Sequence, residues 1–189
     1  MTNGVSGHTL TPMHQLAGEH YLAGRKSEAV KAYREILQRD PNDAIALHGI
    51  GLLELSEGQI KSALTIIEKA VVLDLNNPEY HVTLGIARSM DNDLSLAAEA
   101  FQAALKLRPS NLNARYNFAL CLLKLGESKR AATEFRRILK KQANNTDALS
   151  NLGVAYLKEK EFSKAAQYLK RCLQLDPLNT NARINLGNA

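Results

Sequence analysis

A period of 34 residues runs through almost the whole chain and constrains its fold more than any other feature. Alanine recurs at this spacing in one column, and a large apolar residue recurs four positions later in a second column. The first column is Ala29, Ala63, Ala97, Ala131 and Ala165, and the second is Tyr33, Ile67, Phe101, Phe135 and Leu169. A period of this length predicts stacked structural repeats, in which each unit buries its apolar face against its neighbours.

Each repeat contains two stretches of apolar residues at helical spacing, separated by a short break. In the fourth repeat these stretches cover 118–125 and 131–139, and Gly126 lies between them. Glycine tolerates the left-handed conformation in which many helices end. Asn92 and Lys160 replace this glycine in the third and fifth repeats. Each repeat is therefore predicted to be a hairpin of two helices, with a strained or altered turn at Lys160.

A second break joins one hairpin to the next and combines proline with asparagine or aspartate, as in DPND at 40–43 and RPSN at 108–111. Proline disfavours helix in the residue before it, and the polar residues cap the helix that follows. Residues 1–9 are polar and lack an apolar segment, so a flexible tail is expected there. The breaks predict the start of a sixth repeat over 180–189. They predict five full repeats, which cover 10–43, 44–77, 78–111, 112–145 and 146–179.

The order of residues within a repeat resembles the tetratricopeptide repeat (TPR). Its clearest copies run from Leu84-Gly85 to Pro109 and from Leu152-Gly153 to Pro177. The resemblance covers residues 10–179, although no repeat has a tryptophan near its start. It implies an all-α fold, an α-solenoid wound as a right-handed superhelix of helix-turn-helix repeats. It also implies a scaffold that mediates protein–protein interaction by binding a peptide or partner segment in its concave groove.

In that family the first helix of each repeat lines the groove, and helical geometry identifies the side chains that point into it. The asparagines at 117, 151 and 185 recur at one position, and an amide offers one acceptor and two donors to an extended peptide. The predicted groove residues are Asn113, Tyr116, Asn117, Asp147, Asn151, Asn181, Asn185, Lys124, Lys158, His14 and His48.

The asparagine series resembles the ladder of O-linked N-acetylglucosamine transferases, whose repeat domain holds substrate polypeptide. Two other interpretations remain open, in which these amides bridge neighbouring repeats or simply face water. A clamp for a terminal carboxylate is disfavoured, because the inward columns of adjacent first helices lack the lysines and arginines that it needs.

The net charge of +5 is distributed unevenly along the chain. Repeat 112–145 alone carries +6, mostly from basic residues of its second helix. Such an excess suits nucleic acid or an acidic partner, but a solvated helix face is the interpretation that we favour. Aromatic residues for base stacking are scarce there, so we do not expect nucleic acid to be the partner.

The sequence contains no motif for catalysis, a cofactor or a metal. It has no glycine-rich phosphate loop, no H-E-x-x-H pair and no cysteine pairs at zinc spacing. His14 and His48 lie one repeat apart without a third ligand, which argues against a metal site. Cys121 and Cys172 fall on apolar stripes and are expected to be buried thiols. We therefore expect a chain that is not an enzyme and binds no cofactor or metal.

The apolar runs are too short for a membrane span, and the first residues do not look like a secretory signal, so a cytoplasmic protein is expected. The last helix ends without its predicted partner. One interpretation is self-association through that uncapped end. Another is that the chain is the substrate-targeting region of a larger enzyme of glycosyltransferase, methyltransferase or sulfotransferase type.

Overall fold

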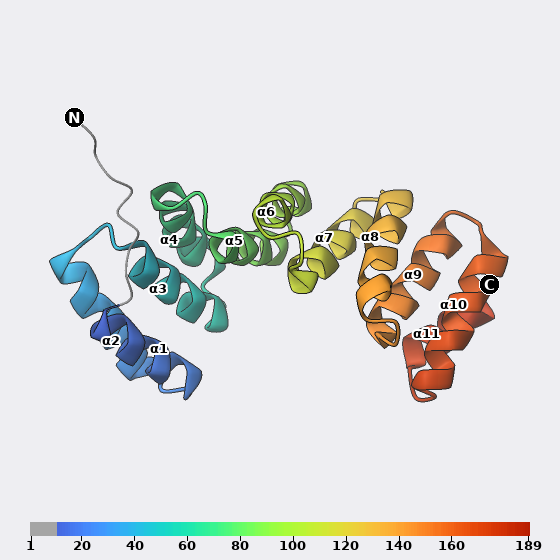
Figure 1. Ribbon diagram of the computed structural model, residues 1–189, viewed down its shortest axis with the longest axis horizontal. Coiled ribbons are helices and arrows are strands. Elements are labelled where there is room, and N and C mark those ends of the chain that lie inside the picture. The colour runs from blue at the N-terminus through green and yellow to red at the C-terminus, as the bar shows by residue number, and fades with distance from the viewer. Residues whose placement is uncertain (1–10) are drawn as a thin grey trace. The chain divides into compact units, whose positions relative to one another are not determined.

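The computed structural model describes residues 11–189, which fold into eleven helices and no strand, and the predicted tail over 1–9 lies outside the described residues. Figure 1 labels the helices in chain order. They are α1 (Pro12–Leu22), α2 (Lys26–Arg39), α3 (Ala44–Ser56), α4 (Ile60–Leu73), α5 (Pro78–Met90), α6 (Leu94–Leu107), α7 (Leu112–Lys124), α8 (Ser128–Lys141), α9 (Thr146–Lys158), α10 (Phe162–Leu175) and α11 (Thr180–Gly187). The all-α fold class is confirmed.

The chain divides into two compact units, Met1–Asn92 and Asp93–Ala189. The first contains α1–α5 and the second contains α6–α11. Within each unit, consecutive helices pack against one another as stacked hairpins. The division falls between α5 and α6, inside the predicted repeat 78–111.

Side chains cap the first helix of every hairpin, as the Asn- and Asp-containing breaks predict. Each cap accepts a hydrogen bond from a backbone N–H in the first turn and so satisfies one of the groups that the helix leaves unpaired. The caps are Thr11, Asp43, Asn77, Asn111, Asn145 and Asn179. The second helices have no side-chain cap, so their starts depend on packing against the first helices.

The turns inside the hairpins are left-handed, as predicted. Gly126 has a φ of 84°, a conformation that costs glycine little. Lys160 takes the equivalent place with a φ of 59°, where a side chain with a Cβ is strained. The expected strain is therefore located in the turn between α9 and α10.

The two columns of the period form the cores of both units. The alanine column has no exposed surface, and the large apolar residues of the second column are all buried. Alanine at these points lets the two helices of a hairpin approach closely, and the larger residue fills the space beside it. In the part of the chain that the structure describes, no helix has the length and apolar character needed to cross a membrane.

Candidate functional site

The predicted groove residues of the second unit lie on its first helices. Asn113, Tyr116 and Asn117 belong to α7, Asp147 and Asn151 to α9, and Asn181 and Asn185 to α11. Those at the starts of the helices are exposed, whereas the tyrosine and the asparagines one turn later are half-buried. The helical period thus gives each helix an exposed polar group followed by a partly buried one.

A pocket of about 260 Å³ brings residues of α7 and α9 together. Its lining residues are Leu112, Asn113, Tyr116, Ile138, Gln142, Asn145 and Asp147. Three of these were predicted from the sequence, and they come from two neighbouring hairpins. The volume is below that of a typical site for a small organic ligand and suits one side chain or a short stretch of backbone.

Asn151 joins the two hairpins through Tyr116, one of the residues that line this pocket. Its Nδ2 donates to the Tyr116 hydroxyl over 3.0 Å and to the backbone carbonyl of Asp147 over 3.0 Å. Both amide hydrogens are therefore occupied, as the bridging interpretation expects. Within residues 11–189 its Oδ1 accepts no hydrogen bond, so one acceptor of this bridge remains open to a ligand.

Asn117 occupies the same position one repeat earlier but bonds only within its own helix. Its Nδ2 donates to the Asn113 carbonyl over 3.0 Å and to Asn113 Oδ1 over 2.8 Å. Its Oδ1, like that of Asn151, accepts nothing from the described residues. Over the same residues, the side chains of Asn181 and Asn185 make no hydrogen bond. The series thus presents acceptors at all three positions and donors only at the last.

Tyr116 contributes a neutral hydroxyl beside these amides. Burial raises the pKa of this phenol, the nearby carboxylate of Asp147 raises it further, and the hydrogen bond from Asn151 lowers it. The ring packs edge-on against Phe135, with centroids 5.9 Å apart. Because its oxygen accepts from Asn151, its proton remains available for a carbonyl acceptor.

In the first unit, the predicted groove residue His48 makes an equivalent bridge, but both hydrogen-bond donors of that bridge are used within the protein. Its Nε2 lies 2.8 Å from Thr83 Oγ1, and that hydroxyl donates to the Glu79 carbonyl over 3.0 Å. The Thr83 proton is therefore occupied, so Nε2 carries a hydrogen and donates. Burial lowers the pKa of His48 to about 4, which keeps the ring neutral. The ring also packs on Tyr80, with centroids 4.6 Å apart.

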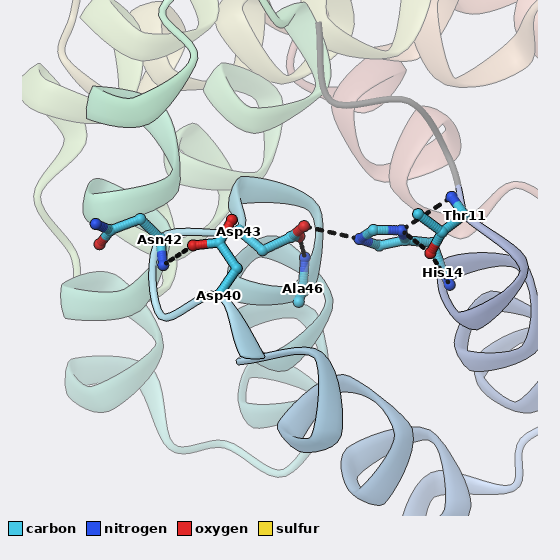
Figure 2. A network of polar contacts seen from close by, with 6 residues as sticks. All are labelled: Thr11, His14, Asp40, Asn42, Asp43 and Ala46. Atoms are coloured by element: carbon cyan, nitrogen blue, oxygen red, sulfur yellow. Dashed lines mark hydrogen bonds and ion pairs between the residues drawn. The ribbon is translucent and has the colours of Figure 1, made fainter. Parts of the chain in front are cut away.

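His14, the other histidine among the predicted groove residues, is buried. Its Nδ1 accepts from the Thr11 backbone N–H over 3.1 Å, which leaves Nε2 to donate to Asp43 Oδ2 over 3.0 Å. The other Asp43 oxygen accepts from the Ala46 N–H at the start of α3, as Figure 2 shows. This network connects the first turns of α1 and α3. The burial of His14 depends on a residue 29 positions away, and its place in the groove stays a prediction.

The remaining predicted residues, Lys124 and Lys158, are exposed at the last positions of α7 and α9. Neither makes an ion pair within the described part of the chain. They place positive charge beside the C-terminal ends of these helices, where it is favourable.

Within residues 11–189, no three His, Cys, Asp or Glu side chains are grouped to hold a metal ion.

Four pocket residues were not predicted as site residues, and two of them, Gln142 and Asn145, are polar. Both lie in the QANN break, and Asn145 Nδ2 donates to Gln142 Oε1 over 3.0 Å while its Oδ1 caps α9. The sequence identified this segment as a helix cap. Its second role as a pocket wall depends on how α8 and α9 pack.

Comparison with known proteins places these features in context. Models of the tetratricopeptide repeat match residues 15–78, 90–153 and 146–179. The BBSome complex member BBS4 of Xenopus tropicalis is 28% identical over 103 residues, which are 54% of this chain and 20% of that protein. The chain thus spans about a fifth of the length of this curated relative.

Two solved structures share the fold. One is YrrB, described as a TPR protein with an unusual peptide-binding site, with a TM-score of 0.84 and 23% identity over 95% of this chain and 92% of that one. The other is MamA, with a TM-score of 0.78 and 25% identity over 87% of this chain and 90% of that one.

Proposed function

The chain belongs to the tetratricopeptide repeat family, and we propose that it is a non-catalytic scaffold whose second unit binds an extended peptide. One observation carries this proposal. Asn117 and Asn151 hold their donors in hydrogen bonds within the protein and keep an acceptor open on successive first helices. Side chains held in place by such bonds lose little further entropy when they bind a ligand.

The groups around the pocket complement a peptide backbone. The open Oδ1 atoms of Asn117 and Asn151 would accept backbone N–H groups, and the Tyr116 hydroxyl would donate to a carbonyl. Backbone pairing of this kind does not depend on the peptide's side chains. Selectivity would then come from the 260 Å³ pocket, where Asp147 and Asn113 favour a polar or basic side chain.

Substitution of the two asparagines tests this proposal. Peptides that bind the unaltered protein would be selected from a random library displayed on beads. Their affinity would then be measured for the unaltered protein and for the double variant Asn117→Ala and Asn151→Ala. Each lost hydrogen bond is worth about 1 kcal/mol, so the affinity should fall by about tenfold or more. Asn76→Ala, at an exposed amide between α4 and α5, is the matched control. Unchanged affinity in the double variant would contradict the proposal.

We also propose a cytoplasmic location and retain self-association as a separate prediction. Cys121 and Cys172 are buried thiols, which suits a reducing compartment. Imaging of a tagged chain tests the location.

Self-association would use Ile184 on α11, which is 61% exposed, and sedimentation at increasing concentration tests that prediction. A monomer at every concentration would exclude it.

A further inference from the structure

A larger pocket lies among α6, α7 and α8, lined by residues other than those of the proposed peptide site. It encloses about 540 Å³. Leu105, Phe118 and Leu122 give it an apolar floor, and all three come from α6 or α7. Residues of α6 and α8 form the walls. Pockets of this size accommodate a large side chain together with the backbone that carries it.

The repeat that follows carries larger side chains at two positions equivalent to residues of this pocket. One repeat later, Tyr156 and Tyr168 stack with centroids 5.6 Å apart. The residues 34 positions earlier are Leu122 and Glu134, which are smaller or polar. Instead of two rings, this interface holds a leucine and a carboxylate, and the space between α6 and α8 remains open.

An ion-pair network fixes that carboxylate. Arg115 donates to Glu134 Oε2 over 2.6 Å and also to the Pro109 carbonyl over 2.6 Å. Arg137 donates to Glu134 Oε1 over 2.6 Å. Both oxygens of Glu134 are thus neutralised, and no other acidic side chain lines the pocket. An incoming anion would meet no unpaired negative charge on its walls.

The rim of the pocket is strongly basic and extends beyond it. A neighbouring depression of about 440 Å³ shares Pro109, Arg115 and Arg137 with the first pocket. Together the two are bordered by Lys106, Lys129, Arg130, Arg137, Lys140 and Lys141. Within residues 11–189, Lys106, Lys140 and Lys141 make no ion pair.

We propose that this basic pocket binds an acidic peptide segment with a large apolar side chain in its centre. The apolar side chain would occupy the floor at Leu105, Phe118 and Leu122, and flanking carboxylates would meet the lysines of the rim. Nucleic acid fits less well, because Phe118 is the one aromatic residue in the lining and is itself buried, so no ring is available for base stacking.

Binding of a synthetic peptide measures this directly. The probe is a fluorescein-labelled peptide of Glu and Asp residues around a central Leu, and its affinity is measured by anisotropy at several salt concentrations. The variant Lys106→Glu with Lys140→Glu reverses two exposed charges. We expect it to weaken binding by about tenfold or more, and rising salt to weaken binding to the unaltered protein.

Matched controls separate this site from general electrostatics. Lys31→Glu with Lys61→Glu changes the net charge equally on exposed lysines of the first unit and should leave the affinity unchanged. Replacing the central Leu of the probe by Ala should also weaken binding. The Asn117→Ala variant should bind this probe normally, which distinguishes this proposal from the one above.

Four outcomes would overturn the proposal. In the first, the unaltered protein does not bind the probe, and in the second, the two double lysine variants lose affinity equally. In the third, replacing the central Leu of the probe leaves its affinity unchanged. In the fourth, a single-stranded oligonucleotide binds more tightly than the peptide. The last would assign the surface to nucleic acid. Circular dichroism of each variant verifies that the helices are retained, which is expected because all four lysines are exposed.

Discussion

The two units use the same bridge between repeats but differ in what it leaves available. In the first unit His48 meets Thr83, and in the second Tyr116 meets Asn151, with the same separation of 35 residues. The histidine–threonine bridge uses the hydroxyl proton of its threonine internally, whereas the tyrosine–asparagine bridge keeps an acceptor and a donor open. Equivalent positions therefore serve packing in one unit and are suited to binding in the other.

The position directly after His48 and Tyr116 in the sequence strengthens this contrast. Gly49 in α3 corresponds to Asn117 in α7, and a Cβ at Gly49 would lie 2.3 Å from Tyr33 Cζ. The ring of Tyr33 thus covers in the first unit the position at which the second unit presents an amide. Charge follows the same division, with 8 basic and 11 acidic residues in Met1–Asn92 and 16 basic and 8 acidic residues in Asp93–Ala189.

Acid should affect the bridge of the first unit most strongly. The pKa of His48 is about 4 in the folded protein, below its ordinary value of 6.5. The unfolded chain therefore takes up this proton first as the pH falls, and the stability contributed above pH 6.5 is lost as the pH approaches 4. The expected loss is about 3 kcal/mol. Urea denaturation at several pH values measures it.

His48→Gln is the matched variant for this test, since it removes the titrating ring. Its stability should fall less steeply between pH 6.5 and 4 than that of the unaltered protein. Tyr116 does not titrate in this range, so Tyr116→Phe should retain the full slope. Equal slopes for the unaltered protein and His48→Gln would show that the buried bridge does not couple to acid.

Substitution at the position directly after His48 or Tyr116 should give the next largest effect. Gly49→Asn forces the Tyr33 ring to move, and overpacking of this kind costs about 1–3 kcal/mol. Asn117→Ala removes a side chain that bonds only within its own helix and should change stability by about 0.5 kcal/mol or less. Denaturant titration compares the two. Similar costs would show that the two units do not differ at this position.

The period made most of the fold predictable. The features that it did not predict depend on contacts between different hairpins. The caps, the left-handed turns and both core columns follow from residue types at fixed spacing, so the sequence identified them. The burial of His14 depends on Asp43 of the next hairpin, and the division at Asn92 depends on packing between whole helices. Neither has a local signal.

The candidate sites were predictable to different degrees. Asn113, Tyr116 and Asp147 were identified because helical geometry places them on one face. The hydrogen bonds that distinguish Asn117 from Asn151 were not predictable, because the same residue type at the same position finds different partners. The basic pocket did have a signal in the charge of repeat 112–145, which alone carries +6, but its opening depends on how α6 and α8 pack on α7.

The turns inside the hairpins should give the smallest effect. Gly58 in the first unit and Lys160 in the second both have positive φ. Gly58→Lys introduces strain of about 1 kcal/mol, and Lys160→Gly should recover about 1 kcal/mol or less, since glycine also adds entropy to the unfolded chain. Thermal unfolding of both variants tests this. Stabilisation by Gly58→Lys would contradict the assignment of strain.

Nuclear magnetic resonance tests most directly whether a ligand binds at the Tyr116–Asn151 bridge and not at the His48–Thr83 bridge. The ¹⁵N-labelled protein would be titrated with a peptide selected from the random library, and the side-chain amide signals followed. We expect the side-chain amides of Asn113, Asn117, Asn151 and Asn185 to shift, and the backbone amides of His48 and Thr83 to remain unchanged. Shifts confined to the first unit, with the asparagines of α7 and α9 unmoved, would contradict it.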